Sequence, residues 1–183
     1  MDELLEKVKD FADRAHGDQT RKYTADRYIV HPMRVMLICQ EYNTDTATQA
    51  DALLHDVLED TPVSKSEIRE FLSSLMPPRQ VERTLDLVIE LTDVYVKEAY
   101  PHLNRKKRKQ LETERLSKVS SEAQTIKYAD LIDNGYDILK HDRHFGRKYL
   151  SEARALLSAM TNGDPELRQR ALKTIDELQK SAI

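Results

Sequence analysis

The sequence predicts an all-α fold that forms a single domain over residues 1–183. Apolar residues recur at helical spacing along most of the chain, and no segment shows the apolar–polar alternation of a half-buried strand. Only 4 Gly, 6 Pro and no Trp occur among the 183 residues, which favours helices over a turn-rich sandwich. Hydrophobic residues make up 39% and charged residues 33%, so a buried core beneath a strongly charged surface is feasible.

Five helices are expected in the first half of the chain. Apolar residues at helical spacing place the first between Leu4 and Gly17. Pro32 suits the first turn of the second helix, and it should push His31, the residue before it, toward an extended conformation. The remaining three are expected over about residues 46–60, 64–75 and 77–91, and a Ser64–Glu67 capping box starts the middle one.

Four more helices are expected in the second half. Residues 92–104 lack a clear period and form the longest predicted loop. A basic helix follows, and Ser120 or Ser121 caps the next one. The four helices are expected over about residues 105–117, 121–140, 145–160 and 165–178.

Composition excludes several classes of protein. The net charge of −3 and the pI near 6.1 argue against a general nucleic-acid binder. No apolar run approaches the roughly 20 residues that span a bilayer. The lone Cys39 cannot form an intrachain disulfide, lies in an apolar stretch that predicts a packed thiol, and indicates a reducing, cytoplasmic location. A basic cluster at residues 105–109 still permits recognition of a small polyanion, and the sequence does not indicate an oligomeric state.

Two histidines and two aspartates in three separate segments carry the candidate chemistry. They are His31, the adjacent pair His55-Asp56, and Asp130. Two imidazoles and two carboxylates are a usable set of ligands for one divalent metal. Taken alone, His31 fits a half-buried side chain and Asp130 an ordinary ion-pair residue. Taken together with the His-Asp pair, they complete a metal site.

Two further acids follow the His-Asp pair. On a continuous helix, residues 55, 56, 59 and 60 would fall at about 0°, 100°, 40° and 140° and share one face of an otherwise apolar helix. Burial of one imidazole and three carboxylates is prohibitive without compensation, which a divalent cation would supply. Core salt bridges to Arg or Lys are the alternative. Glu59 and Asp60 would be unliganded acids beside a metal, as activation of water requires.

These motifs resemble the HD-domain phosphohydrolases, in which an isolated His, a His-Asp pair and a distant Asp hold the metal. Members of that superfamily that bind two metals carry additional histidines between the His-Asp pair and the last Asp. Here only His102 lies in that interval, so one metal is expected. The resemblance narrows to the hydrolase domain of RelA/SpoT enzymes and the stand-alone small alarmone hydrolases, and covers about residues 10–160, with further helices to 183. It rests on Arg21-Lys22, on Tyr28-Ile29-Val30-His31-Pro32, on Ala52-Leu53-Leu54-His55-Asp56-Val57-Leu58-Glu59-Asp60-Thr61 and on Lys127-Tyr128-Ala129-Asp130-Leu131-Ile132-Asp133-Asn134.

The resemblance implies a metal-dependent guanosine-3′,5′-bis(diphosphate) 3′-pyrophosphohydrolase, which removes the 3′-pyrophosphate of (p)ppGpp, typically with Mn²⁺. Mixed His/Asp ligands also suit Fe²⁺, Co²⁺ and Zn²⁺. The resemblance assigns the metal to His31, His55, Asp56 and Asp130, the attacking water to Glu59 and Asp60, and the substrate to Arg21, Lys22, Asn134 and Lys106.

The expected substrate pocket departs from the family pattern. Leu131 stands where a basic residue commonly follows the metal Asp, Asp133 stands before Asn134, and Tyr136 replaces an Arg. Two alternatives therefore stay open: an HD phosphohydrolase acting on another nucleotide such as NADPH, and a catalytically idle nucleotide-binding sensor. Further phosphate or base contacts could come from the next helix, through Arg143, Arg147 and Tyr149.

Overall fold

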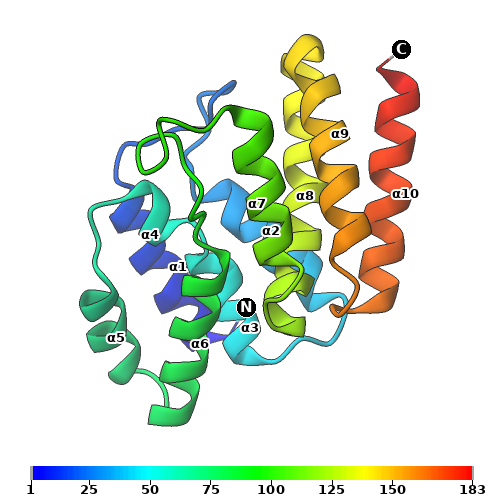
Figure 1. The fold of residues 1–183 in the computed structure, drawn as a ribbon. Coiled ribbons are helices and arrows are strands. Elements are labelled where there is room, and N and C mark those ends of the chain that lie inside the picture. Colours follow the sequence, from blue (N-terminus) through cyan, green and yellow to red (C-terminus); the bar gives the residue numbers. More distant parts are fainter. Residues whose placement is uncertain (1, 183) are drawn as a thin grey trace. The chain divides into compact units, whose positions relative to one another are not determined.

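The computed structural model describes residues 2–182, and the regular structure in this range is helical, which confirms the all-α prediction. One isolated bridge, between Thr20 and Arg27, interrupts the loop that follows the first helix. The helices are α1 (Glu3–His16), α2 (Val30–Gln40), α3 (Thr46–Leu54), α4 (Val57–Asp60), α5 (Lys65–Ser73), α6 (Pro78–Leu91), α7 (Arg105–Leu116), α8 (Ser121–His141), α9 (Arg143–Ala159) and α10 (Pro165–Ser181) (Figure 1).

The helices fall into two compact units, Met1–Thr92 and Asp93–Ile183. In the first unit, α3 is the central helix and packs against α1, α2 and α6. Its Leu53 and Leu54 side chains are fully buried, as expected for a helix that is apolar on most sides. The end of this central helix therefore presents the His-Asp pair from a rigid position.

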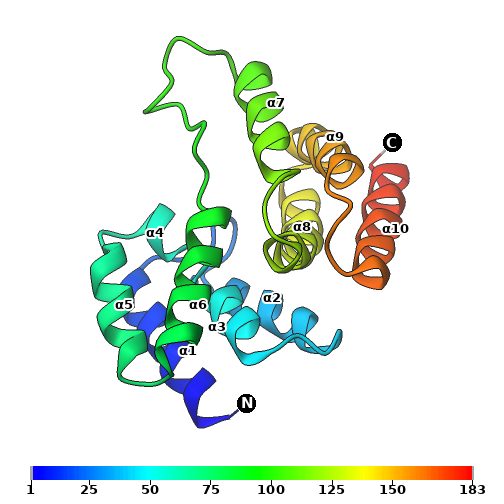
Figure 2. The same cartoon turned by 60° about the horizontal axis from the view of Figure 1, so that its bottom comes forward.

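In the second unit, α8, α9 and α10 lie side by side, and α7 packs on α9 (Figure 2). The turn between α9 and α10 is attached to α8 through the buried Tyr128, whose hydroxyl donates to the Met160 carbonyl at 3.0 Å. The amide of Gly163 donates to the same hydroxyl at 3.3 Å. A Cβ at Gly163 would lie 2.5 Å from the Tyr128 ring, so this close approach requires glycine.

Several local predictions are confirmed. Ser64 and Glu67 form the capping box of α5, and Ser120 caps α8 by accepting a hydrogen bond from the Ala123 amide. Cys39 is buried in α2, and burial raises the pKa of its thiol to about 12, which suits a packed thiol and not a nucleophile. None of the helices within residues 2–182 combines the length and the apolar character that a lipid bilayer would require.

The prediction of an extended His31 is wrong. α2 begins at Val30, so His31 and Pro32 both lie in its first turn. Proline is tolerated there because the first amide groups of a helix have no partner within the helix. His31 consequently projects from the start of a helix, where its side chain is buried.

The prediction of one helix over residues 46–60 is also wrong, because the helix breaks at the His-Asp pair. α3 ends at Leu54, and α4 begins after Asp56, whose φ and ψ are −95° and −6°. The His55 imidazole bonds through Nδ1 to the Ala52 carbonyl at 2.9 Å. In a continuous helix that carbonyl would accept from the amide of Asp56, so the side chain competes with the helix at this point.

Candidate functional site

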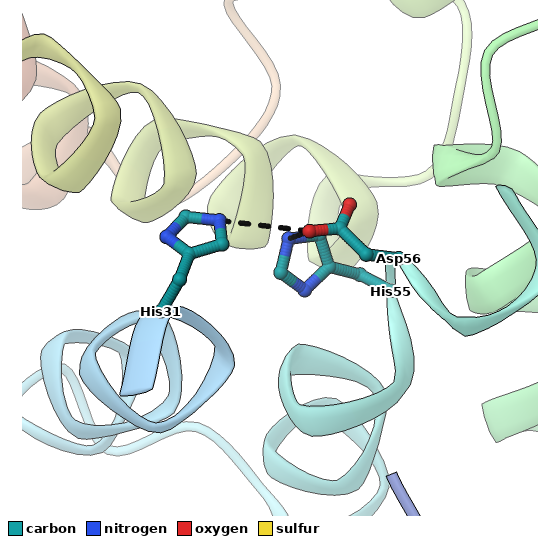
Figure 3. Close-up of side chains that lie close together, drawn as sticks. All are labelled: His31, His55 and Asp56. Atoms are coloured by element: carbon teal, nitrogen blue, oxygen red, sulfur yellow. Dashed lines mark ion pairs between the residues drawn. The ribbon is translucent and has the colours of Figure 1, made fainter. Parts of the chain in front are cut away.

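Three of the four predicted metal ligands lie together in the first unit. His31 comes from the first turn of α2, while His55 and Asp56 form the break between α3 and α4. Their ligand atoms all lie within 4.8 Å of one another. The Nε2 atoms of His31 and His55 are 3.7 Å and 3.3 Å from Asp56 Oδ2 (Figure 3).

The surroundings of His55 prepare its ring to coordinate a cation. Its Nδ1 lies 2.9 Å from the Ala52 carbonyl, which can only accept a hydrogen bond, so this nitrogen carries the proton. Nε2 then has a lone pair directed toward Asp56 and His31. Both imidazoles are buried, with 1% and 3% of the side chains exposed, whereas Asp56 keeps 19% and opens the cluster to solvent.

This donor set fits a divalent metal ion. Two imidazole nitrogens and a carboxylate oxygen suit Mn²⁺, Fe²⁺, Co²⁺ and Zn²⁺. Asp56 precedes α4 without capping it, so its carboxylate is turned into the cluster instead of toward the helix amides. The structure therefore brings together three residues that could hold a metal ion, all of them predicted from the sequence.

Tyr28 belongs to the same cluster, although the sequence analysis assigned it no role. Its hydroxyl donates to Asp56 Oδ2 at 2.7 Å. Burial and the negative charges of Asp56 and Asp60 raise the pKa of Tyr28 far above its ordinary value, so the phenol stays protonated. The sequence position of Tyr28, three residues before His31, could have predicted that the two side chains lie close together near the start of α2.

The two predicted water-activating acids follow on α4, which places Glu59 and Asp60 one helical turn after the His-Asp pair. Both residues are exposed. The pKa of Asp60 is nevertheless raised, mainly by partial desolvation of its carboxyl group and then by the charge of Asp56. The polar side chains of Tyr28 and Gln19 act in the opposite direction. A carboxylate with a raised pKa is a stronger proton acceptor than an ordinary Asp.

Arg21 and Lys22, the predicted basic pair, lie in the loop between α1 and α2. Arg21 is buried, and its guanidinium carbon is 5.6 Å from the centre of the Tyr28 ring, next to the metal cluster. Lys22 is exposed, and its Nζ is 4.9 Å from the Tyr23 ring. Arg21 therefore lies near the predicted metal ligands, because it contacts the Tyr28 ring, whereas Lys22 contacts the Tyr23 ring.

Asp130, the fourth predicted ligand, lies on α8 in the second unit and is buried. Asn134, one turn later, donates from Nδ2 to Asp130 Oδ1 at 2.5 Å, and Lys127 Nζ lies 2.8 Å from Oδ2. Both oxygens therefore have a nitrogen donor, which fixes the orientation of the carboxylate. That Asp130 joins the metal ligands of the first unit stays a prediction.

A cavity of about 670 Å³ opens beside Asp130 within the second unit. Two of its basic residues are paired: Arg105 forms two hydrogen bonds with Glu152, at 2.9 Å and 2.6 Å, and Lys109 Nζ lies 3.2 Å from Asp93. The lining of this cavity also includes Asp130, Asn134, Lys106, Lys127, Lys148 and Tyr149.

Arg143, Arg147 and Tyr149 of α9 were possible substrate contacts in the sequence analysis, and they differ in their surroundings. Tyr149 lines the cavity. Arg143 instead donates to the Ser181 carbonyl at 2.7 Å, and Arg147 donates to the Ala182 carbonyl at the same distance. These two arginines hold the end of α10 and do not belong to the lining of the cavity.

A family comparison decides what kind of domain carries this site. The family described as HD domain matches residues 9–134, a range that contains every predicted ligand from His31 to Asp130. The chain belongs to the HD domain family. This finding confirms the resemblance to HD-domain proteins that the motifs predict.

Curated relatives of this HD domain include two named as (p)ppGpp hydrolases. It is 26% identical over 137 residues to a probable guanosine-3′,5′-bis(diphosphate) 3′-pyrophosphohydrolase of Mycoplasma pneumoniae, which covers 72% of this chain and 18% of the relative. It is 44% identical over 68 residues to the guanosine-3′,5′-bis(diphosphate) 3′-pyrophosphohydrolase of Aquifex aeolicus, covering 37% and 10%. The chain thus spans less than a fifth of the length of these relatives.

Solved structures show the same fold. A metazoan orthologue of SpoT, described as hydrolysing ppGpp, superposes with a TM-score of 0.79 at 24% identity, covering 99% of this chain and 96% of that one. The lmo0812 protein of Listeria monocytogenes superposes with a TM-score of 0.63 at 20% identity, covering 87% and 99%. The HD domain therefore has the fold of a structure of nearly its own length.

Proposed function

We propose that this HD domain is a metal-dependent (p)ppGpp 3′-pyrophosphohydrolase. The observation that carries the proposal is the buried cluster of His31, His55 and Asp56, followed by Glu59 and Asp60 within one helical turn. A metal site with adjacent acids is the equipment for hydrolysis of a phosphoester. The names of the relatives from Mycoplasma pneumoniae and Aquifex aeolicus support (p)ppGpp as the substrate.

The proposed roles follow from the side chains present. His31, His55, Asp56 and Asp130 would hold one metal, with Mn²⁺ expected first and Fe²⁺, Co²⁺ or Zn²⁺ compatible with the same ligands. When bound, the cation would lower the pKa of water and polarise a phosphoryl oxygen. Glu59 and Asp60 would orient the water and accept its proton. Hydrolysis would release pyrophosphate and leave GDP or GTP.

Arg21, Lys22, Lys106 and Asn134 are the residues proposed to bind the nucleotide. Arg21 lies next to Tyr28 at the metal cluster, and Lys22 follows it in the same loop. In the second unit, Lys106 and Asn134 line the cavity that also contains Asp130. Because Lys106 is exposed and no ion pair is recorded for it within residues 2–182, its charge is available to a phosphate group.

Product analysis tests the proposal against its alternatives. The purified chain with Mn²⁺ is incubated with ppGpp and, separately, with NADPH, and phosphorus NMR identifies pyrophosphate or orthophosphate. We expect pyrophosphate from ppGpp, a loss of at least about 10²-fold in kcat for Glu59→Gln, and no change for Glu70→Gln, an exposed acid on α5. Orthophosphate from NADPH without turnover of ppGpp would contradict it, as would ppGpp binding without any product.

A further inference from the structure

The hydroxyl of Tyr28 bonds to one proposed metal ligand and lies near a second acid. Tyr28 donates to Asp56 Oδ2, the oxygen that also faces both imidazoles, at 2.7 Å. Besides burial, the charge of Asp60 also acts on this phenol and raises its pKa. Asp56 is a proposed metal ligand, and Asp60 is a proposed water-activating acid. Tyr28 therefore lies beside both the metal site and the proposed proton acceptor.

The ring of Tyr28 is held by three neighbours. His16, at the end of α1, stacks on it with ring centres 4.4 Å apart and planes inclined by 27°. His31 meets it edge-on at 6.2 Å, and the guanidinium of Arg21 lies 5.6 Å from its centre. These neighbours fix the ring and therefore the position of the hydroxyl that bonds to Asp56.

His16 is itself anchored. It is 6% exposed, and its Nδ1 lies 2.9 Å from the amide oxygen of Gln19, which can only accept, so Nδ1 carries the proton. Gln19 thus holds the His16 ring in the orientation that stacks on Tyr28.

Asp56 precedes α4 and Asp60 ends it, and this helix is too short to fix their side chains. Asp56 has no hydrogen bond to the amides of α4, and α4 contains only four residues. A helix of one turn is too short to be stable by itself. The carboxyl groups at its two ends, on Asp56 and Asp60, are thus oriented by side chains from outside the helix.

We propose that Tyr28 is a positioning residue, whose hydroxyl fixes the metal-ligating carboxylate of Asp56 beside the proposed proton acceptor Asp60, and that His16 holds its ring in place. This inference rests on the proposed function for the role of Asp60, while the role toward Asp56 depends only on the metal site. Loss of the hydroxyl is expected to weaken both metal binding and turnover.

The test uses Tyr28→Phe in the full chain, with Tyr42→Phe as the control, a half-buried tyrosine after the opposite end of α2 from His31. Mn²⁺ binding is measured by calorimetry, and kcat and KM for ppGpp are measured at saturating Mn²⁺. We expect Tyr28→Phe to bind Mn²⁺ about tenfold more weakly and to lose about tenfold or more in kcat, with KM changed less than threefold. Tyr42→Phe should match the wild type in all three quantities.

Two substitutions of His16 separate positioning from general damage. His16→Phe keeps a stacking ring and should retain most of the Mn²⁺ affinity, whereas His16→Ala should lose part of it. In the Tyr28→Phe background, His16→Ala should add little further loss, because both act through one hydroxyl. Additive losses would overturn the proposed coupling.

The outcomes distinguish this inference from the proposed function. If Tyr28→Phe keeps the Mn²⁺ affinity and kcat of the wild type while Glu59→Gln is inactive, the positioning role is wrong and the proposed function stands. If the wild type does not hydrolyse ppGpp, the proposed function fails, and Mn²⁺ affinity alone still decides whether Tyr28 supports the metal site.

Discussion

Asp56 and Asp130, the two carboxylates proposed to bind one metal, are supported in opposite ways in the two units. Asp56 accepts from the neutral phenol of Tyr28 and faces two imidazoles. Asp130 is paired with the ammonium group of Lys127 and with the amide of Asn134. The negative charge of Asp130 is thus balanced by Lys127. We propose that the charge of Asp56 is balanced by a bound metal ion instead.

This contrast predicts that the two units respond differently to a metal ion and to a substrate. The first unit brings three possible ligands together, and the Ala52 carbonyl fixes the proton of His55 on Nδ1. The second unit places Asp130 beside a cavity in which several acids are paired with bases, among them Glu152 and Asp93. Binding of the metal should therefore affect the first unit most, and binding of the anionic substrate the second.

Asp56→Asn should give the largest effect. An amide oxygen is a poorer metal ligand than a carboxylate, so we expect Mn²⁺ binding to become undetectable and turnover of ppGpp to fall at least about 10³-fold. In EDTA the free energy of unfolding should change by less than about 1 kcal/mol, because the amide oxygen still accepts from Tyr28. Calorimetry with Mn²⁺ and denaturant unfolding check the two parts, and a large destabilisation in EDTA would contradict the contrast.

Lys127→Met should give an intermediate effect of a different kind. Removal of the ammonium group takes the charged partner in this contact away from the buried Asp130, so we expect unfolding to cost about 1–3 kcal/mol less with or without Mn²⁺. Mn²⁺ affinity should fall about tenfold because the ligand is less well oriented. Lys127→Arg should recover much of the stability. Wild-type stability in EDTA for Lys127→Met would show that the pair does not support Asp130.

Asp51→Asn should give the smallest effect, confined to stability. Asp51 is fully buried on α3, and burial, followed by the charges of Glu90 and Asp56, raises its pKa well above the ordinary value. A raised pKa means that the folded state binds the proton more tightly, so stability is highest below the unfolded pKa of about 4 and falls as the pH rises toward the folded pKa.

The substitution removes this pH dependence, because asparagine carries no titratable proton. At pH 8 we expect Asp51→Asn to be about 1–3 kcal/mol more stable than the wild type. Near pH 4 the two proteins should have nearly equal free energies of unfolding. Denaturant titrations at several pH values measure the difference, and an equal difference at every pH would rule out titration of Asp51 as its cause.

Much of the fold could be predicted because local signals mark the helix ends. The capping box at Ser64, the proline at the start of α6 and the serine before α8 each satisfy or remove an end amide, so the boundaries follow from the sequence. The break at His55 could not be predicted from periodicity, because it depends on a side chain that occupies the Ala52 carbonyl.

The candidate site shows the same division. The cluster of His31, His55 and Asp56 could be predicted because ligand type and motif spacing are visible in the sequence. The supporting contacts could not be predicted: Tyr28 reaches Asp56 across 28 positions, and His16 acts by stacking on a ring in another element. Such contacts depend on how helices pack, which motif spacing alone does not specify.

We propose that His31, His55, Asp56 and Asp130 bind one metal ion. Anomalous diffraction from crystals grown with Mn²⁺ tests this proposal directly, because the signal locates the ion independently of the protein. We predict one peak within bonding distance of His31 Nε2, His55 Nε2, Asp56 and Asp130. A peak on the first three residues without Asp130, or no peak at these residues, would contradict the proposal.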